Sequence, residues 1–236
     1  MGGSIDFAKY LLGGKRGLAI DNDPQKVNIM RREGYECVLG DVIRIDLPAD
    51  SVRFVVMIHL LEHLPDRESI EKSIKSAAKV ATDFIYIRGP YFDADEYLES
   101  KGLKFFWSDW TGHPYHLKTD ELRSTLDDLG LNNYKIVKFN EVLDSSHPAV
   151  HPINSPKNQH RYKWRKHPAK PFVKFKEKLY TEFICYVQLR PFENWENIIQ
   201  SHKRKPLMWI LKTYYRKIFL EEESLWEKII YFFFKT

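Results

Sequence analysis

The sequence predicts an α/β protein built on a doubly wound, mostly parallel sheet. Short apolar strands alternate with amphipathic helices, and Gly, Asn, Asp or Pro stands at most of the junctions between them. The run RFVVMIH at 53–59 is apolar almost throughout, which is typical of a parallel strand covered on both faces. With 236 residues, 43% of them hydrophobic, the chain can bury a large core.

The first 139 residues carry the regular alternation. Helices are expected at 4–12, 24–33, 67–80 and 119–130, and strands at 17–20, 35–39, 53–59, 84–88 and 134–139. Asp23 is the expected N-cap of the second helix, with Pro24 in its first turn, and Thr119 that of the last. Right-handed crossovers place the C-terminal ends of parallel strands on one edge of the sheet, so a ligand is expected there.

The rest of the chain is less regular. The pattern is lost from about 140 to 178, a stretch with five prolines and four histidines, and returns in a strand at 181–189. From 194 onward the chain is expected to be helical. The predicted organisation is therefore an α/β domain at 1–190, with a basic Pro/His-rich insertion at 140–180, and a basic aromatic helical tail at 191–236.

Charge is distributed unevenly along the chain. Residues 1–150 carry 19 Lys+Arg against 24 Asp+Glu, whereas residues 151–236 carry 18 against 8. The basic part could face phosphates, anionic lipid or an acidic substrate, or could serve solubility alone. The sequence has no apolar run long enough to cross a membrane, and its opening predicts no secretory signal. Two cysteines predict no disulfide framework, and a cytoplasmic protein is expected.

Two acidic residues follow neighbouring predicted strands. Asp21 ends the first strand and Asp41 ends the next one along the chain. In an open α/β sheet, an acid at such a position can bind a ribose diol, and one a strand further out can accept from an adenine amino group. The alternative is that both are turn residues or helix caps.

Together with their surroundings these residues resemble a known family. The runs GLAIDNDPQKV at 17–27, Gly40-Asp41-Val42, and DLPADSVRFVVMIHLLEHLPD at 46–66 resemble class I S-adenosylmethionine-dependent methyltransferases, in the type 11-like branch with a Leu-Glu-His motif. The resemblance covers 2–139 and the strand at 181–189. It implies a Rossmann-like fold whose last strand is antiparallel, with S-adenosylmethionine as cofactor. The cofactor-binding residues that it implies are Gly2, Gly3, Asp21, Asn22, Asp41, Val42 and His59.

The sequence also departs from that family. The family's first motif is a central strand ending in an acid, followed by a glycine-rich turn, and only Gly2-Gly3-Ser4 and the next residues resemble it. The strand itself is missing, so a late-assigned start or a truncated product is expected. The strands at 17–20 and 53–59 should then pair directly, or the chain should be marginally stable and bind its cofactor weakly. Arg53 stands where the family often has Asp, and no Pro-Gly-Gly turn precedes the fifth strand.

The candidate catalytic residues are His113 and His116. An oxygen nucleophile that accepts a methyl group benefits from a general base, and the enzyme mainly positions it opposite the sulfur. His113-Pro-Tyr-His116 has Trp107 and Trp110 beside it, a composition that suits a sugar or another ring; alternatively, this loop packs on the core. A structural role is expected for His63. The histidines at 147, 151, 160 and 167 match no tight zinc pattern, so no metal is expected.

The predicted function is S-adenosylmethionine-dependent methyl transfer to a small-molecule or glycan acceptor. The absence of an Asn-Pro-Pro-Tyr-type motif counts against methylation of amino groups on bases or glutamine. The alternative is a non-catalytic or truncated methyltransferase-like binding module. A nucleic-acid methyltransferase ranks third, because no nucleic-acid module is recognisable. The tail at 203–236, with eight Lys+Arg and four Glu, could contact an anionic membrane surface, although packing on its own domain or on a second subunit is favoured.

Overall fold

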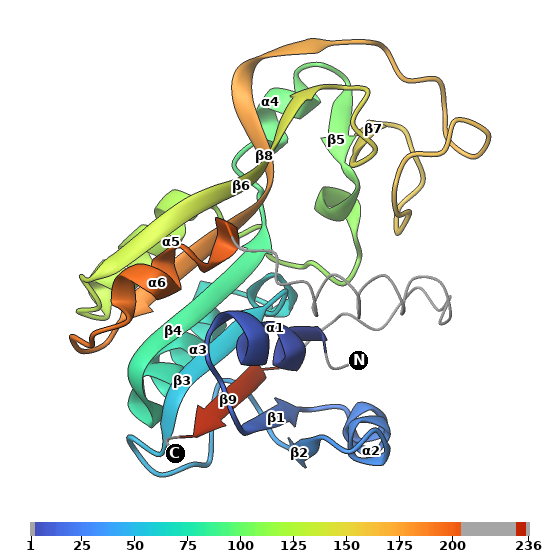
Figure 1. The fold of residues 1–236 in the computed structure, drawn as a ribbon. Coiled ribbons are helices and arrows are strands. Elements are labelled where there is room, and N and C mark those ends of the chain that lie inside the picture. The colour runs from blue at the N-terminus through green and yellow to red at the C-terminus, as the bar shows by residue number, and fades with distance from the viewer. Residues whose placement is uncertain (1–2, 204–229, 235–236) are drawn as a thin grey trace.

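The computed structural model of the protein describes residues 3–203 and 230–234. A seven-stranded sheet runs in the order β2-β1-β9-β3-β4-β8-β6, and a separate two-stranded sheet pairs β5 with β7 (Figure 1). The strands are β1 (Gly17–Asp21), β2 (Glu36–Leu39), β3 (Val52–Ile58), β4 (Ala81–Pro90), β5 (Leu103–Phe105), β6 (Tyr134–Asp144), β7 (Val150–Pro152), β8 (Lys174–Gln188) and β9 (Ile230–Phe234). The α-helices are α1 (Gly3–Leu11), α2 (Pro24–Arg32), α3 (Arg67–Val80), α4 (Asp95–Glu99), α5 (Thr119–Asp128) and α6 (Trp195–Ile199).

The sheet has the parallel and antiparallel parts that the sequence predicts. β1 pairs with β2 in parallel, and β3 pairs with β4 in parallel. β8 is antiparallel to both β4 and β6, so 134–139 and 181–189 lie in the antiparallel hairpin that the resemblance implied. The α/β fold class is therefore confirmed. The expected mostly parallel sheet is not, because two of the six pairings between the described strands of this sheet are parallel and the other four are antiparallel.

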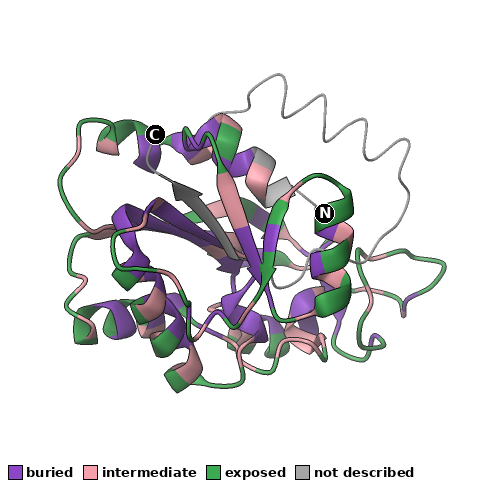
Figure 2. Cartoon of the chain, turned by 90° about the horizontal axis from the view of Figure 1, so that it is seen from below, coloured by how far each residue is buried: buried purple, intermediate pink, exposed green. Residues whose placement is uncertain are grey.

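Helices cover both faces of the sheet. Alternate residues of β3 point to opposite faces, as the two-residue period of a strand requires. Phe54 and Val56 belong to one apolar cluster, which also holds core residues of α1, α2 and α6. Val55 and Met57 belong to the other, which holds core residues of α3 and α5. Figure 2 shows buried strands between helices whose outer sides are exposed.

The centre of the sheet corrects a prediction. β1 and β3 do not pair with one another, because β9 lies between them and is antiparallel to both. Leu18 is opposite Phe232 in one ladder, and Val55 is opposite Phe232 in the other. The two strands therefore each gain a hydrogen-bonded neighbour at the position where the sequence predicted a gap. The backbone groups of β1 and β3 that face this position are therefore not left without a neighbouring strand.

The chain beyond 194 differs from the expected all-helical tail. α6 and a short 3-10 turn, Ser201–Lys203, are helical, but 230–234 form a strand. Ile198 and Ile199 pack in the core, and the Ser201 hydroxyl is 3.1 Å from that of Tyr186 on β8. The part of the predicted membrane-contacting segment at 204–229 lies outside the described residues. None of the described helices has the length and apolar character needed to cross a bilayer.

The insertion is shorter than expected. β6 continues to Asp144 and β8 already begins at Lys174, so the irregular stretch spans 145–173 and includes β7. Neither β5 nor α4 was predicted. Both are short, three and five residues, and depend on tertiary partners such as the pairing of β5 with β7.

Two local predictions are also resolved. Lys118 takes the N-cap position of α5, and the predicted cap Thr119 is already the first helical residue. Thr119 N–H and hydroxyl both donate to the Asp93 carboxylate, which therefore supplies the missing cap. Arg53, which departs from the family pattern, donates to Asp83 on β4 at 2.9 Å, so this arginine ties two neighbouring strands together.

Candidate functional site

The candidate site lies at the C-terminal edge of the parallel strands. β3 leads into His59, and the chain then forms a 3-10 turn at Leu61–His63. β4 ends at Pro90 beside it, since β3 and β4 are parallel neighbours. This edge is where open α/β sheets bind their ligands.

His59 has an unusual backbone conformation. Its φ is +50°, a left-handed region that non-glycine residues adopt rarely and that often marks functional positions. Its N–H donates to the Arg88 carbonyl at 2.8 Å, which continues the β3–β4 ladder by one residue. The side chain lies between two carboxylates: Nδ1 is 3.2 Å from Glu62 Oε1, and Nε2 is 3.0 Å from Glu182 Oε1.

Glu182 is also bound by Arg88. Nε and one terminal nitrogen of Arg88 donate to the two Glu182 oxygens at 3.0 and 2.7 Å, the planar two-pronged geometry that arginine favours. The Arg88 guanidinium also lies 5.6 Å from the centre of the Phe139 ring. His59, Glu62, Arg88 and Glu182 thus form one connected group, which we call the edge cluster.

The ionisation of the edge cluster follows from these contacts. Burial by itself would lower the pKa of His59, but its bonds to Glu182 and Glu62 raise that pKa to about 9. Burial would raise the pKa of Glu182, yet Arg88 and His59 bring it down to about 2. The pKa of Glu62 is lowered as well, mainly by His59 against the effect of burial. At neutral pH the cluster therefore holds two cations and two anions.

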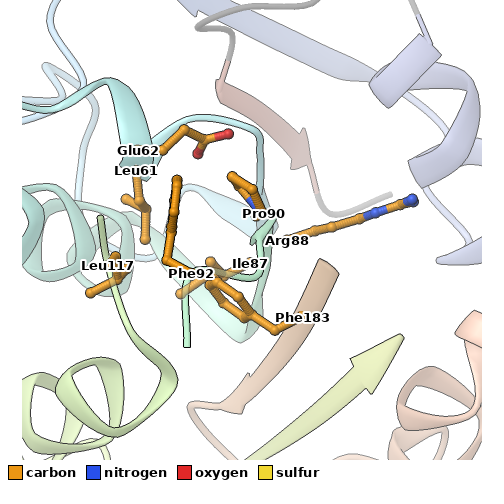
Figure 3. A pocket seen from close by; sticks show the side chains of 9 residues that line it. Leu61, Glu62, Ile87, Arg88, Pro90, Phe92, Leu117 and Phe183 are labelled. Atoms are coloured by element: carbon orange, nitrogen blue, oxygen red, sulfur yellow. The ribbon is translucent and has the colours of Figure 1, made fainter. Parts of the chain in front are cut away.

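A small pocket opens next to the edge cluster. It has a volume of about 10 Å³, room for about one water molecule, and is lined by Leu61, Glu62, Ile87, Arg88, Gly89, Pro90, Phe92, Leu117 and Phe183 (Figure 3). A Cβ on Gly89 would lie 3.3 Å from Phe183 Cε1 and 3.7 Å from Glu62 Oε2, so glycine keeps β4 close to both. The lining is apolar except for Glu62 and Arg88.

His116 lies beside this pocket and has a carboxylate partner. Its ring stacks on Phe92, with centres 4.3 Å apart and planes 12° apart. His116 Nδ1 is 2.8 Å from Asp95 Oδ2, and the Ser108 hydroxyl donates to Asp95 Oδ1 at 2.7 Å. A carboxylate that orients the imidazole of a general base is a recurring arrangement in enzymes.

The other predicted catalytic residue, His113, faces a different neighbour. Its ring centre is 4.8 Å from that of His63, in an edge-on arrangement, and 6.2 Å from that of Phe92. Its Nδ1 is 2.9 Å from the Trp107 carbonyl. The structure therefore brings both predicted histidines to the pocket region through Phe92, and it places the Asp95 carboxylate beside His116.

Several of the predicted cofactor-binding residues lie at the ends of β1 and β2. Asp21 ends β1, where it is opposite Leu39 of the parallel strand β2, and the Gly40 N–H donates to the Asp21 carbonyl. Asn22 and Asp41 follow these two strand ends and are exposed, while Val42 is buried. Gly3 begins α1, and Gly2 lies outside the described residues.

The carboxylates at this edge are hydrogen-bond acceptors of the kind that the donors of a nucleoside require. Asp21 Oδ1 accepts from the Asp23 N–H at 2.8 Å, and Asp41 Oδ1 accepts from the Ile43 N–H at 3.1 Å. A carboxylate has acceptor capacity for further donors, and ribose hydroxyls and an adenine amino group are donors. His59 fits less directly, because both of its ring nitrogens already face carboxylates. The predicted contact with a cofactor would have to use its backbone or the face of its ring.

Sequence reasoning missed Arg88, Glu182 and Asp95. A signal was present for the first two, since each is a single charge within an otherwise apolar strand, FIYIRGP and TEFICYV. Lone charges in buried strands need partners. The partners lie 94 residues apart, so the pairing itself could not be read from local sequence.

Comparisons with known proteins agree with this fold. The sequence matches no protein-family model and no curated protein. Among solved structures, a putative methyltransferase from Bacillus halodurans aligns with 80% of this chain and 89% of its own, at a TM-score of 0.51 and 13% identity. A methyltransferase from Archaeoglobus fulgidus aligns with 72% of this chain and 75% of its own, at a TM-score of 0.48 and 16% identity. One from Methanosarcina mazei aligns with 78% of this chain and 85% of its own, at a TM-score of 0.46 and 13% identity. The chain has the fold of S-adenosylmethionine-dependent methyltransferases, as the sequence resemblance implied.

Proposed function

We propose that this protein transfers a methyl group from S-adenosylmethionine to an oxygen of a small-molecule or glycan acceptor. The observation that carries the proposal is the His116–Asp95 pair, which stacks on a wall residue of the pocket at the ligand-binding edge of this fold. When bound, the cofactor supplies an electrophilic methyl group on sulfur. The chain has to hold the cofactor, orient the acceptor and take up its proton.

The cofactor would lie along the ends of β1 and β2. In this proposal Asp21 binds the ribose hydroxyls and Asp41 binds the adenine amino group, because both acids follow neighbouring parallel strands. Val42, which is buried next to Asp41, offers apolar contact to the adenine ring. Asn22 and Gly3 would complete the contacts at this edge.

His116 is suited to act as the general base. The Asp95 carboxylate can only accept, so Nδ1 of a neutral His116 carries the proton that points to it. Nε2 then keeps its lone pair and can accept the proton of an acceptor hydroxyl. The His116 side chain remains 37% exposed, so an acceptor can reach it.

An aromatic surface next to His116 supports a ring-shaped acceptor. Trp110 lies 6.3 Å from His113 and 4.9 Å from His160, measured between ring centres. Phe92 is buried, and its ring packs against the rings of both His113 and His116. Flat apolar rings beside hydrogen-bonding imidazoles suit the faces and hydroxyls of a sugar.

Calorimetric titration with S-adenosylmethionine and S-adenosylhomocysteine tests the cofactor step. We expect the chain to bind both and Asp21→Ala, which changes a buried acid at the end of β1, to abolish binding, whereas Asp46→Ala, which changes an exposed acid, should not. Conversion of S-adenosylmethionine to S-adenosylhomocysteine is then measured with panels of hydroxyl-bearing sugars and phenols. Unchanged cofactor affinity in Asp21→Ala would contradict the assigned site.

One observation favours a second candidate, a non-catalytic binding module. In the family that the sequence resembles, the central strand leads into the glycine-rich turn near the methionine part of the cofactor. Here β9 lies between β1 and β3 and runs antiparallel to them, so it cannot lead into such a turn at this edge. Cofactor binding without turnover on any acceptor in the panel would support this second function.

A further inference from the structure

A second side-chain cluster shares Glu62 with the edge cluster. Glu62, His63 and His113 each offer a ligand atom, and these three atoms lie within 4.8 Å of one another. We propose that these three residues form a binding site for a divalent transition-metal ion of the zinc type. The argument rests on tautomers, burial and the ligand set, and it does not depend on methyl transfer.

Backbone carbonyls fix the tautomers of both imidazoles. His63 Nδ1 is 2.6 Å from the Gly112 carbonyl, and His113 Nδ1 is 2.9 Å from the Trp107 carbonyl. A carbonyl oxygen can only accept, so each Nδ1 must carry a hydrogen. In the neutral rings Nε2 then holds the lone pair. Imidazoles that ligate metals through Nε2 are commonly held by such a second bond from Nδ1.

The lone pair of His63 faces a buried environment. His63 is only 9% exposed, and its Nε2 is a buried atom with no hydrogen-bond partner. An unpartnered buried polar atom costs free energy, and a metal ion bound to this nitrogen would offset that cost. The His113 ring meets His63 edge-on with centres 4.8 Å apart, which brings the second imidazole to the same spot.

Glu62 supplies the anionic member of the set. It is 2% exposed, and one of its oxygens accepts from His59 while the carboxylate retains further acceptor sites. Two imidazoles and one carboxylate are the ligands of many zinc sites that keep a fourth position open. Glu62 also lines the pocket described above, so a bound ion would lie at the pocket wall.

The chain is shaped to bring these residues together. Glu62 and His63 belong to the turn after β3, whereas Gly112 and His113 belong to the loop before α5. His63 and Gly112, which share a hydrogen bond, are 49 residues apart along the chain. A Cβ on Gly112 would lie 3.2 Å from Trp110 Cδ1 and 3.7 Å from His63 Nδ1. Glycine at this position therefore lets the loop approach the imidazole closely.

Titration of the full-length, chelator-treated protein with zinc chloride tests the site. Calorimetry should show one zinc ion per chain. His63→Gln and His113→Gln should each weaken zinc affinity by more than the roughly 10–100-fold that loss of an outer partner costs. His116→Gln, which changes a neighbouring histidine outside the cluster, should bind zinc as the unchanged chain does. Zinc should raise the melting temperature of the unchanged chain and of His116→Gln only.

Cobalt(II) gives a readout that needs no variant. The unchanged chain loaded with cobalt should show visible absorption bands of four- or five-coordinate nitrogen–oxygen ligation, and zinc should displace them. The cobalt bands test the site even if a variant fails to fold, a failure that circular dichroism would reveal. A chain that binds no stoichiometric zinc overturns the proposal. So does a single site that survives both His63→Gln and His113→Gln, because the ion would then lie elsewhere.

Discussion

Arg88 on β4 and Glu182 on β8 form a two-pronged ion pair, with nitrogen–oxygen distances of 3.0 and 2.7 Å. Their strands are antiparallel neighbours, and the pair lies where the parallel part of the sheet meets its antiparallel hairpin. Glu182 also faces His59 at the end of β3. One carboxylate therefore links three strands at the edge where the candidate site lies.

The first prediction concerns the stability that this carboxylate provides. Glu182→Gln should lower the free energy of unfolding by about 3 kcal/mol, because it leaves Arg88 without its partner. This value is at the low end of the free-energy range for breaking a buried ion pair, because the side chains of Arg88 and Glu182 remain 21% and 14% exposed. Urea denaturation measures the effect. Glu177→Gln, at an exposed position on the same strand, is the control and should change little.

The second prediction concerns pH. The pKa of His59 is about 9 in the folded chain, against an ordinary value of 6.5. The folded state therefore binds this proton more tightly, so the stabilisation is fully present below about pH 6.5 and is lost as pH rises through about 9. Unfolding free energies measured from pH 6 to 10 should decline over that range. His59→Gln should flatten the decline, while the exposed His160→Gln should retain it; equal slopes in all three chains would contradict the assignment.

The third prediction separates catalysis from cofactor binding. His116→Gln should lower the turnover number by about 10²–10⁴-fold, because it removes the general base, and should leave S-adenosylmethionine affinity unchanged. Asp41→Ala should do the reverse, raising the cofactor dissociation constant more than it affects turnover at saturation. Both are measured with an acceptor that shows turnover in the panel. A His116→Gln enzyme with full turnover would remove this histidine from the chemistry.

The fourth prediction concerns β9. Phe232→Pro removes a backbone N–H from the strand between β1 and β3, and proline is poorly tolerated in central strands. We expect the free energy of unfolding to fall by about 1–3 kcal/mol or more, the cost of a buried backbone group left unpaired. Thermal denaturation and amide exchange at Leu18 and Val55 measure it. Ala169→Pro in the exposed insertion is the matched control; an equal, small effect in both would show that β9 does not hold this position.

Much of the fold could be read from the sequence because its determinants are local. The periodicity of 67–80 and the carboxylate of Asp23 predicted α3 and the N-cap of α2 as the structure has them. The alternation of strands and helices predicted the parallel pairs β1–β2 and β3–β4, and the resemblance predicted that 181–189 is antiparallel. The positions of Asp21 and Asp41 after successive apolar strands predicted that both lie at the ends of neighbouring strands. These features depend on side-chain period, capping chemistry and the handedness of crossovers.

The tertiary structure alone decided which distant groups meet. The sequence left the space between β1 and β3 empty, whereas the structure fills it with 230–234, a segment more than 170 residues from β3 along the chain. It also joined Arg88 to Glu182 and His63 to the loop of His113. Local propensity is silent on such contacts, because a strand, a buried charge or an imidazole finds its partner only when the whole chain has closed around it. Which backbone fills the centre of the sheet, and which side chains share the site, were therefore settled by long-range pairing and burial.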